Sequence, residues 1–201
     1  MIGAVTKRQK IVAAARELFL VQSYEKTTME EIARAVPMSK ATLYTEFNNK
    51  EEVLLEICRN HIDEMNARLA AVVEATENDF LPTLKTMMLT LVEGIYGVAA
   101  GLRSPEALIF ESTRLQTLLV DHTERMPEII RALFEKAKTS GEIDKDTDSS
   151  LVAAAVLSAL TSYLPPYPRH FTKHSRPTLE SLKEDLSVLL DLLCKGLSTK
   201  K

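Results

Sequence analysis

The stretch TMEEIARAVPMSKATLYTEFNNK, from Thr28 to Lys50, decides the fold of the N-terminal part of this chain. Thr28 and Glu31 have the spacing of a capping box, in which each side chain satisfies the other residue's backbone N–H group. Pro37 lacks a backbone N–H and disfavours helical geometry at the residue before it, so the helix is predicted to end there. The chain must then turn before a second helix begins.

The second helix of this stretch is short and has two different sides. Leu43 and Phe47 are four residues apart, so both point to one side of the helix and into a core. Five other side chains are left to face outward: Lys40, Ala41, Thr42, Tyr44 and Thr45. Two helices joined by a sharp turn form a helix-turn-helix, whose second helix enters the major groove of DNA. The stretch therefore predicts binding to a DNA duplex.

A third helix is predicted to start at Lys50, after two asparagines. Backbone N–H groups at a helix N-terminus also bind phosphate, so Lys50 is predicted to clamp the DNA backbone. Two alternatives stay open: the Tyr44 ring packs partly against the helix core, and the Thr45 hydroxyl is simply solvated. The predicted DNA contacts are Thr28, Ser39, Lys40, Ala41, Thr42, Tyr44, Thr45 and Lys50.

Apolar residues upstream follow helical spacing from Ile11 to Phe19 and predict another helix over the back of this motif. With that helix included, the order and spacing of residues in the first quarter of the chain resemble the TetR family of transcriptional regulators. The matching residues are Arg8, Ile11, Ala14, Ala15, Leu18, Phe19, Tyr24, Thr28, Ile32, Ala33, Ser39, Thr42, Leu43, Tyr44, Phe47 and Lys50.

This resemblance implies an all-α fold with two domains. Residues 1–50 would form a three-helix DNA-binding domain with the helix-turn-helix. Residues 51–201 would form a larger helical domain for effector binding and dimerisation, joined to the first by a long helix that the apolar spacing predicts from residue 51 to about residue 77.

The chain departs from the family's usual pattern at several positions. The departures are Ser23 for a usual glycine, Pro37 and Met38 for a common Gly-Val, Ala41 for a frequent glycine, and Glu46 for a frequent histidine. Glu46 matters most for function, because its carboxylate would repel the DNA backbone unless it turns away or pairs with Lys50.

Charge is unevenly distributed along the chain. The net charge of the whole chain is −3, which is unusual for a protein that binds nucleic acid. Residues 1–50 nevertheless carry eight basic and five acidic side chains, a net charge of +3, whereas the other 151 residues carry −6. A basic N-terminal part joined to an acidic remainder lets only one face of the protein approach phosphates. Lys7, Arg8 and Lys10 either extend as an arm towards DNA or form a frayed, solvated terminus.

Composition and motifs exclude several other classes of protein. The chain is 45% hydrophobic, enough for a real core, but has no apolar run of about eighteen residues and no signal-peptide segment, so a cytoplasmic protein is expected. It also lacks the nucleophile, phosphate-loop and metalloprotease motifs of enzymes. His170 and His174 are four residues apart within a predicted proline-rich loop, and Cys58 and Cys194 lie on apolar stripes. No enzyme, metal site or cofactor is predicted.

The middle of the chain is predicted to be helical, with a candidate small-molecule pocket. Its candidate lining residues are Met87, Met88, Leu91, Ile95, Phe110, Phe134 and Tyr163. Methionine and aromatic stripes are usually only core. Many TetR regulators release DNA when a small apolar or amphipathic compound enters this domain, and the resemblance therefore favours a ligand site here.

Two helices near the C-terminus are candidates for a dimer surface. One is rich in alanine and ends before Pro165, and the other carries more leucine than one small domain usually buries. Two copies of this pair would pack as a four-helix bundle, and a dimer suits a palindromic operator. The alternative is an internal core stripe. The predicted interface residues are Val152, Val156, Ala159, Leu182, Leu186, Leu189, Leu190 and Leu193.

Together these observations predict a homodimeric regulator, of repressor type by its family resemblance, that binds double-stranded DNA and releases its operator when a small-molecule effector binds. The alternative is a helical ligand-binding or structural dimer module whose helix-turn-helix has lost specific DNA binding, which Pro37 and Glu46 keep open.

Overall fold

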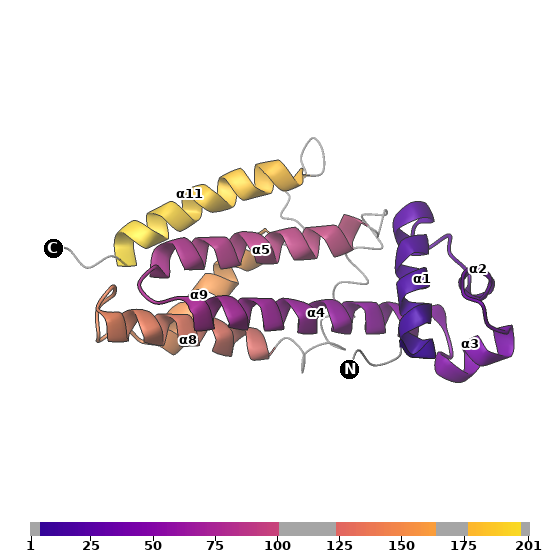
Figure 1. Ribbon diagram of the computed structural model, residues 1–201. Coiled ribbons are helices and arrows are strands. Elements are labelled where there is room, and N and C mark those ends of the chain that lie inside the picture. Colours follow the sequence, from indigo (N-terminus) through magenta and orange to yellow (C-terminus); the bar gives the residue numbers. More distant parts are fainter. Residues whose placement is uncertain (1–4, 101–123, 164–176, 198–201) are drawn as a thin grey trace. The chain divides into compact units, whose positions relative to one another are not determined.

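A computed structural model describes residues 5–100, 124–163 and 177–197 of the chain. Every regular element within these ranges is an α-helix, which confirms the predicted all-α fold (Figure 1). The chain divides into two compact units, residues 1–62 with 97–120 and residues 63–96 with 121–201, and each unit has a hydrophobic core of its own. The assignment of DNA binding to residues 1–50 and of effector binding to residues 51–201 is a functional division and stays a prediction.

The first unit contains helices α1 (Lys7–Gln22), α2 (Met29–Ala35), α3 (Lys40–Glu46) and the start of α4 (Lys50–Ala75). Leu43 and Phe47 are fully buried in its core, as their spacing predicts, together with Ile11, Ala15, Phe19, Ile32, Val53, Leu54 and Ile57. Cys58 also lies in this core, and burial raises the pKa of its thiol to about 11. The thiol is therefore neutral near pH 7, as expected of a packed cysteine.

The ends of α2 and α3 form as the sequence predicts. The Thr28 hydroxyl accepts a hydrogen bond from the Glu31 backbone N–H at 3.2 Å, and the Glu31 carboxylate accepts one from the Thr28 backbone N–H at 2.8 Å, which completes the capping box. α2 ends at Ala35, before Pro37, and the Ser39 side chain caps α3. Short helices of this kind depend on such caps, because four backbone N–H groups at each N-terminus otherwise lack partners.

Ser23, one of the departures from the family pattern, has an unusual backbone conformation at the end of α1. Its φ of 79° and ψ of 157° fall in a region that is almost exclusively occupied by glycine. The conformation is held by hydrogen bonds to Phe19 and Thr27 on either side of it. A serine at this position therefore stores strain that a glycine would not.

The second unit contains the rest of α4, most of α5 (Phe80–Ala100), α8 (Arg125–Ser140), α9 (Ser149–Thr161) and α11 (Leu179–Leu197). Its core includes an edge-to-face pair of Phe80 and Phe134, with ring centroids 5.0 Å apart. Gly141, with a φ of 79°, ends α8, and the Asp148 carboxylate caps α9. Among the described helices, none is both long and apolar enough to cross a bilayer.

The side chain of Lys136 on α8 closes the C-terminal end of α4. Its ammonium group donates hydrogen bonds to the backbone carbonyls of Val73, Glu74 and Thr76, at 2.8, 2.9 and 3.1 Å. Carbonyl groups at a helix C-terminus lack partners within the helix and carry partial negative charge, so a lysine is favourable there. This contact fixes α8 against the end of α4 inside the second unit.

Replacement of Ser23 by glycine is expected to stabilise the protein by about 1 kcal/mol, because it removes the strain of a side chain at positive φ. Chemical denaturation followed by circular dichroism measures the change. Ser23→Ala is the matched control, since it keeps the Cβ atom and therefore the strain. Equal stabilisation by alanine and glycine, or none by glycine, would contradict the explanation.

Candidate nucleic-acid interface

The outward side of α3 is open to solvent along its whole length. Lys40, Ala41, Tyr44 and Thr45 are exposed and Thr42 is half-buried, whereas Leu43 on the other side is fully buried. Tyr44 keeps 41% of its surface accessible, so its ring is partly exposed and only partly packed against the protein. α3 therefore presents a polar surface on a helix that is anchored from behind.

Several of the predicted DNA-contacting hydroxyls also have partners within the motif. Ser39 Oγ accepts a hydrogen bond from the Thr42 backbone N–H at 3.1 Å, and the two hydroxyls lie 2.9 Å apart. The Thr45 hydroxyl donates to the Thr42 carbonyl at 2.7 Å. The Thr28 hydroxyl is engaged by the capping box, in which it accepts a hydrogen bond from the Glu31 backbone N–H. These groups stabilise the helices, and a role of Thr28, Ser39, Thr42 and Thr45 in DNA contact stays a prediction.

Lys40 at the start of α3 forms an ion pair with Glu30 on α2. The hydrogen bond between them lowers the pKa of Glu30 and raises the pKa of Lys40, in both cases as the main cause. The ammonium also lies 5.9 Å from the centre of the Tyr44 ring. Because both side chains are exposed, solvent screens the pair and its effect on stability is small. The main consequence of the ion pair is that the Lys40 side chain has a preferred orientation in the absence of DNA.

The ammonium group of Lys50 faces the loop between α1 and α2. It donates hydrogen bonds to the carbonyls of Tyr24 and Thr27 at 2.6 and 2.9 Å, lies 3.4 Å from the Glu25 carbonyl, and sits 4.2 Å from the centre of the Tyr24 ring. An ammonium has three donors, so a phosphate would have to replace one of these carbonyls. The role of Lys50 as a phosphate clamp stays a prediction, and the structure gives it a position that ties the loop to α4.

Arg8 supports the C-terminal end of α3, a role that sequence reasoning did not assign. Its guanidinium donates to the Glu46 carbonyl at 2.7 Å and to the Glu56 carboxylate at 3.0 Å, and it stacks 4.0 Å from the centre of the Phe47 ring. An arginine satisfies a carbonyl, a carboxylate and an aromatic face at once because its planar fork carries five donors. Arg8 therefore faces the protein. Lys7, Arg8 and Lys10 lie in the first turns of α1, which Thr6 caps, so the predictions of an extended arm and of a frayed terminus are both wrong.

The predicted ligand-binding residues lie mostly within the core of the second unit. Met87, Met88, Leu91 and Phe134 are buried, and Ile95 and Tyr163 are half-buried. Phe110 lies outside the described residues, as do His170 and His174. Desolvation, with a smaller contribution from the Asp185 carboxylate, raises the pKa of the Tyr163 hydroxyl. Met87, Met88, Leu91 and Phe134 belong to one core cluster and Tyr163 packs against it, and a role of these residues in ligand binding stays a prediction.

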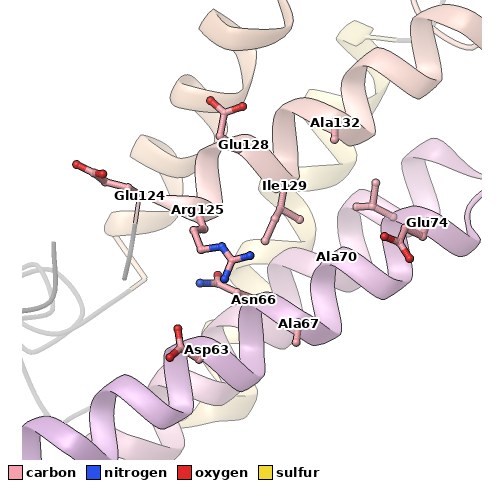
Figure 2. Close-up of a pocket in the computed structure, with 11 residues that line it drawn as sticks. Asp63, Asn66, Ala67, Ala70, Glu74, Glu124, Arg125, Glu128, Ile129 and Ala132 are labelled. Carbon is pink, nitrogen blue, oxygen red and sulfur yellow. The ribbon is translucent and has the colours of Figure 1, made fainter. Parts of the chain in front are cut away.

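The structure has a pocket of about 570 Å³ at a different place in the second unit, between α4 and α8. We call it the α4–α8 groove (Figure 2). None of the predicted ligand residues that the structure describes lines it. The lining residues from α4 are Asp63, Asn66, Ala67, Ala70, Val73 and Glu74, and those from α8 or just before it are Glu124, Arg125, Glu128, Ile129 and Ala132.

The predicted dimer residues divide into buried and half-buried ones. Val156, Leu182, Leu186 and Leu190 have at most 5% of their surface exposed and belong to the core of the chain itself, so little surface is left for a second copy. For these residues the structure matches the alternative of an internal core stripe. Val152, Ala159, Leu189 and Leu193 are half-buried.

Other apolar side chains of the same two helices face solvent. On α9, Leu151 is 67% exposed, and Ala154, Ala155 and Ser158 follow it at helical spacing on the exposed side. On α11, Val188 and Leu192 are four residues apart and 62% and 61% exposed. We call these residues the outer faces of α9 and α11.

Comparison with known proteins supports the reading of the first unit. Residues 11–57 match the family model described as bacterial regulatory proteins, tetR family. The transcriptional regulator SrpR of Pseudomonas putida is 27% identical over 151 residues, which are 70% of this chain and 65% of SrpR. The regulator TcmR of Streptomyces glaucescens is 42% identical, but over 35% of this chain and 31% of TcmR. The chain thus spans less than two thirds of either relative.

The fold extends beyond the matched helices. The transcriptional repressor AcnR of Corynebacterium glutamicum is 23% identical over 92% of this chain and 89% of AcnR. A transcriptional regulator from Cytophaga hutchinsonii, at 18% identity, superposes with a TM-score of 0.79 over 94% of this chain and 97% of that chain. With its capped helix-turn-helix and the family match over residues 11–57, the N-terminal part of the protein belongs to the TetR family of bacterial regulatory proteins.

Proposed function

We propose that this protein is a homodimeric transcriptional repressor, acting in the bacterial cytoplasm, that binds a palindromic DNA operator and releases it when a small-molecule effector binds the second unit. The single observation that carries the DNA-binding part is the two-sided geometry of α3. Its apolar side is buried in the first unit, and its polar side is exposed from Lys40 to Thr45. A helix held in this way can enter a major groove without unfolding.

The relatives support a regulatory role. SrpR and TcmR are named transcriptional regulators, and AcnR, which aligns over most of this chain, is named a transcriptional repressor. Repression rather than activation is carried over from this similarity.

The outer faces of α9 and α11 support the dimer. Leu151 on α9 and Val188 and Leu192 on α11 each expose more than 60% of their surface, and exposed apolar side chains on a helix favour an interaction surface. Alanines and serines beside Leu151 allow close approach of a second helix. We therefore place the dimer interface on these outer faces, with the half-buried Val152, Leu189 and Leu193 at its margin.

Selection of random duplex DNA by the purified protein, followed by sequencing of the retained fraction, tests the function. A palindromic sequence should be recovered, and Tyr44→Ala should weaken binding to that sequence more than binding to random DNA. Affinity should fall steeply with salt, because phosphate contacts release counterions. If no sequence is enriched, the protein is better described as a ligand-binding or structural dimer module.

Glu30→Gln is expected to reduce the discrimination between the recovered sequence and random DNA by about threefold. The substitution removes a negative charge near the phosphates and frees Lys40, so binding to random duplex should become tighter while the direction of Lys40 is lost. Fluorescence anisotropy with both duplexes measures the ratio. Glu17→Gln makes the same charge change at an exposed position of α1 and should leave the ratio unchanged. Equal ratios in the two variants would show that Glu30 does not position Lys40.

Leu192→Asp is expected to shift the protein from dimer to monomer, because a carboxylate would be buried without a partner at the interface. Sedimentation velocity over a range of concentrations measures the distribution. Val21→Asp is the matched control, since Val21 on α1 is 71% exposed and lies outside the proposed interface. A Leu192→Asp variant that stays dimeric would exclude the outer face of α11 as the interface.

A further inference from the structure

The guanidinium of Arg8 joins three helices of the first unit. Arg8 lies in the first turn of α1, which the Thr6 hydroxyl caps. From there it donates to the Glu46 carbonyl at the end of α3 and to the Glu56 carboxylate on α4, at 2.7 and 3.0 Å, and it lies 4.0 Å from the centre of the Phe47 ring. One side chain therefore links the end of α3 to both helices behind it.

The two ends of α3 are held by different groups. The Ser39 hydroxyl caps the start of the helix, and the hydrogen bond from the Phe47 backbone N–H to the Leu43 carbonyl, at 3.0 Å, closes the last turn. The carbonyl that Arg8 binds belongs to Glu46, one of the last residues of α3, and the last carbonyls of a helix lack partners within it. A helix of seven residues has no further turns to absorb fraying, so loss of the Arg8 contact should loosen this end first.

Neighbouring carboxylates balance the charge of Arg8. The hydrogen bond to Glu56 is the main cause that raises the pKa of Arg8, against a smaller effect of desolvation, and the charges of Glu46 and Glu52 act in the same direction as Glu56. A second guanidinium, that of Arg59, lies 3.9 Å from the same Glu56 oxygen. Because its charge is engaged by the protein, Arg8 is suited to holding α3 in place rather than to attracting a phosphate.

We propose that Arg8 and Glu56 are positioning residues for operator recognition, which hold the C-terminal end of α3 against α1 and α4 and so set the discrimination between operator and random DNA. The inference rests on the DNA-binding function proposed above and assigns part of its specificity to a contact behind the recognition surface. Hydrogen bonds to base edges require a defined orientation of the helix, whereas attraction to phosphates depends on charge. Loss of the contact should therefore reduce specificity more than attraction.

Lysine is not expected to replace Arg8 in this role. A planar guanidinium binds a carbonyl and a carboxylate at once and stacks on an aromatic ring, whereas an ammonium is a compact charge without this fork. Arg8→Lys therefore keeps the charge of α1 and removes the geometry. If Arg8 served DNA binding through a phosphate contact instead, the lysine variant would retain most of the binding.

Hydrogen exchange of the backbone amides, followed by NMR of the full-length protein without DNA, tests the hold on α3. The Phe47 amide should exchange about fivefold faster in Arg8→Lys, because the end of α3 opens more often once the contact is lost. Ile32→Val is the control for general loss of stability, since it removes one methyl group from a fully buried residue of α2. Equal exchange rates of Phe47 in the two variants, or a wild-type rate in Arg8→Lys, would overturn the proposal.

Fluorescence anisotropy with the recovered operator and with random duplex tests the effect on specificity. Arg8→Lys and Glu56→Gln should each lower the ratio of the two affinities by about tenfold, because each removes a charged hydrogen bond between half-buried groups. In Arg8→Lys the affinity for random duplex should stay unchanged, since the charge is kept. Arg16→Lys is the matched control, the same substitution at an exposed position of α1, and should keep the wild-type ratio.

Two results of the anisotropy measurement would overturn the proposal: a wild-type ratio in Arg8→Lys, or an equal loss of affinity for both duplexes. Either result leaves the proposed function intact, because the wild-type protein still selects its operator. A wild-type protein that selects no sequence would overturn the function and with it the specificity role. The exchange rate of Phe47 is measured without DNA, so it shows in every case whether Arg8 holds the end of α3.

Discussion

A helix of seven residues is not stable on its own in water, so α3 depends on what its buried side contacts. Leu43 and Phe47 are both almost completely removed from solvent, and Arg8 stacks on the Phe47 ring while it binds the Glu46 carbonyl. The hydroxyl of Ser39 closes the other end. Burial of Leu43 and Phe47, stacking by Arg8 and capping by Ser39 therefore hold α3 in place. Apart from the hydroxyls of Thr42 and Thr45, the outward side of α3 contributes little to this stability. That division is what allows the same seven residues to serve as a recognition surface.

Lysine is used in the same way in both units. Lys50 in the first unit and Lys136 in the second each direct an ammonium at a group of backbone carbonyls that lie outside regular helix hydrogen bonding. This use has a consequence for the basic charge of the first fifty residues. Arg8, Lys40 and Lys50 all have protein partners, so part of the net charge of +3 that suggested DNA binding is already engaged. In the proposed complex with DNA, Lys40 would exchange the Glu30 carboxylate for a phosphate, so this contact would add less to net attraction than a lysine without an ion-pair partner would.

Local features of the fold could be predicted from the sequence, whereas the sites that depend on packing direction could not. Some features act within a few residues of the chain: the capping hydroxyls, Pro37 and the spacing of Leu43 and Phe47. Their effect on local structure can therefore be predicted from the sequence alone. On α11, leucines and a valine occupy several sides of the helix, and periodicity alone does not say whether Leu186 or Leu192 faces the chain's own core. The structure buries Leu186 and exposes Leu192. Similarly, Met87 and Met88 give an apolar signal and are buried in the core, whereas the α4–α8 groove is lined mainly by alanines and carboxylates, which give no apolar signal.

One helix belongs to both cores, and this bears on how a ligand would act. Val53, Leu54 and Ile57 of α4 pack in the first core, and Met65, Leu69 and Val73 of the same helix pack in the second. The groove residues from Asp63 to Glu74 are on that helix, within a continuous run of backbone hydrogen bonds. A ligand shifts an equilibrium only by its difference in affinity for two states, so an effector in the groove requires two arrangements of α4 that it distinguishes. Because the groove uses both α4 and α8, any change in the distance between these helices alters its shape. The contact of Lys136 with the end of α4 opposes such a change.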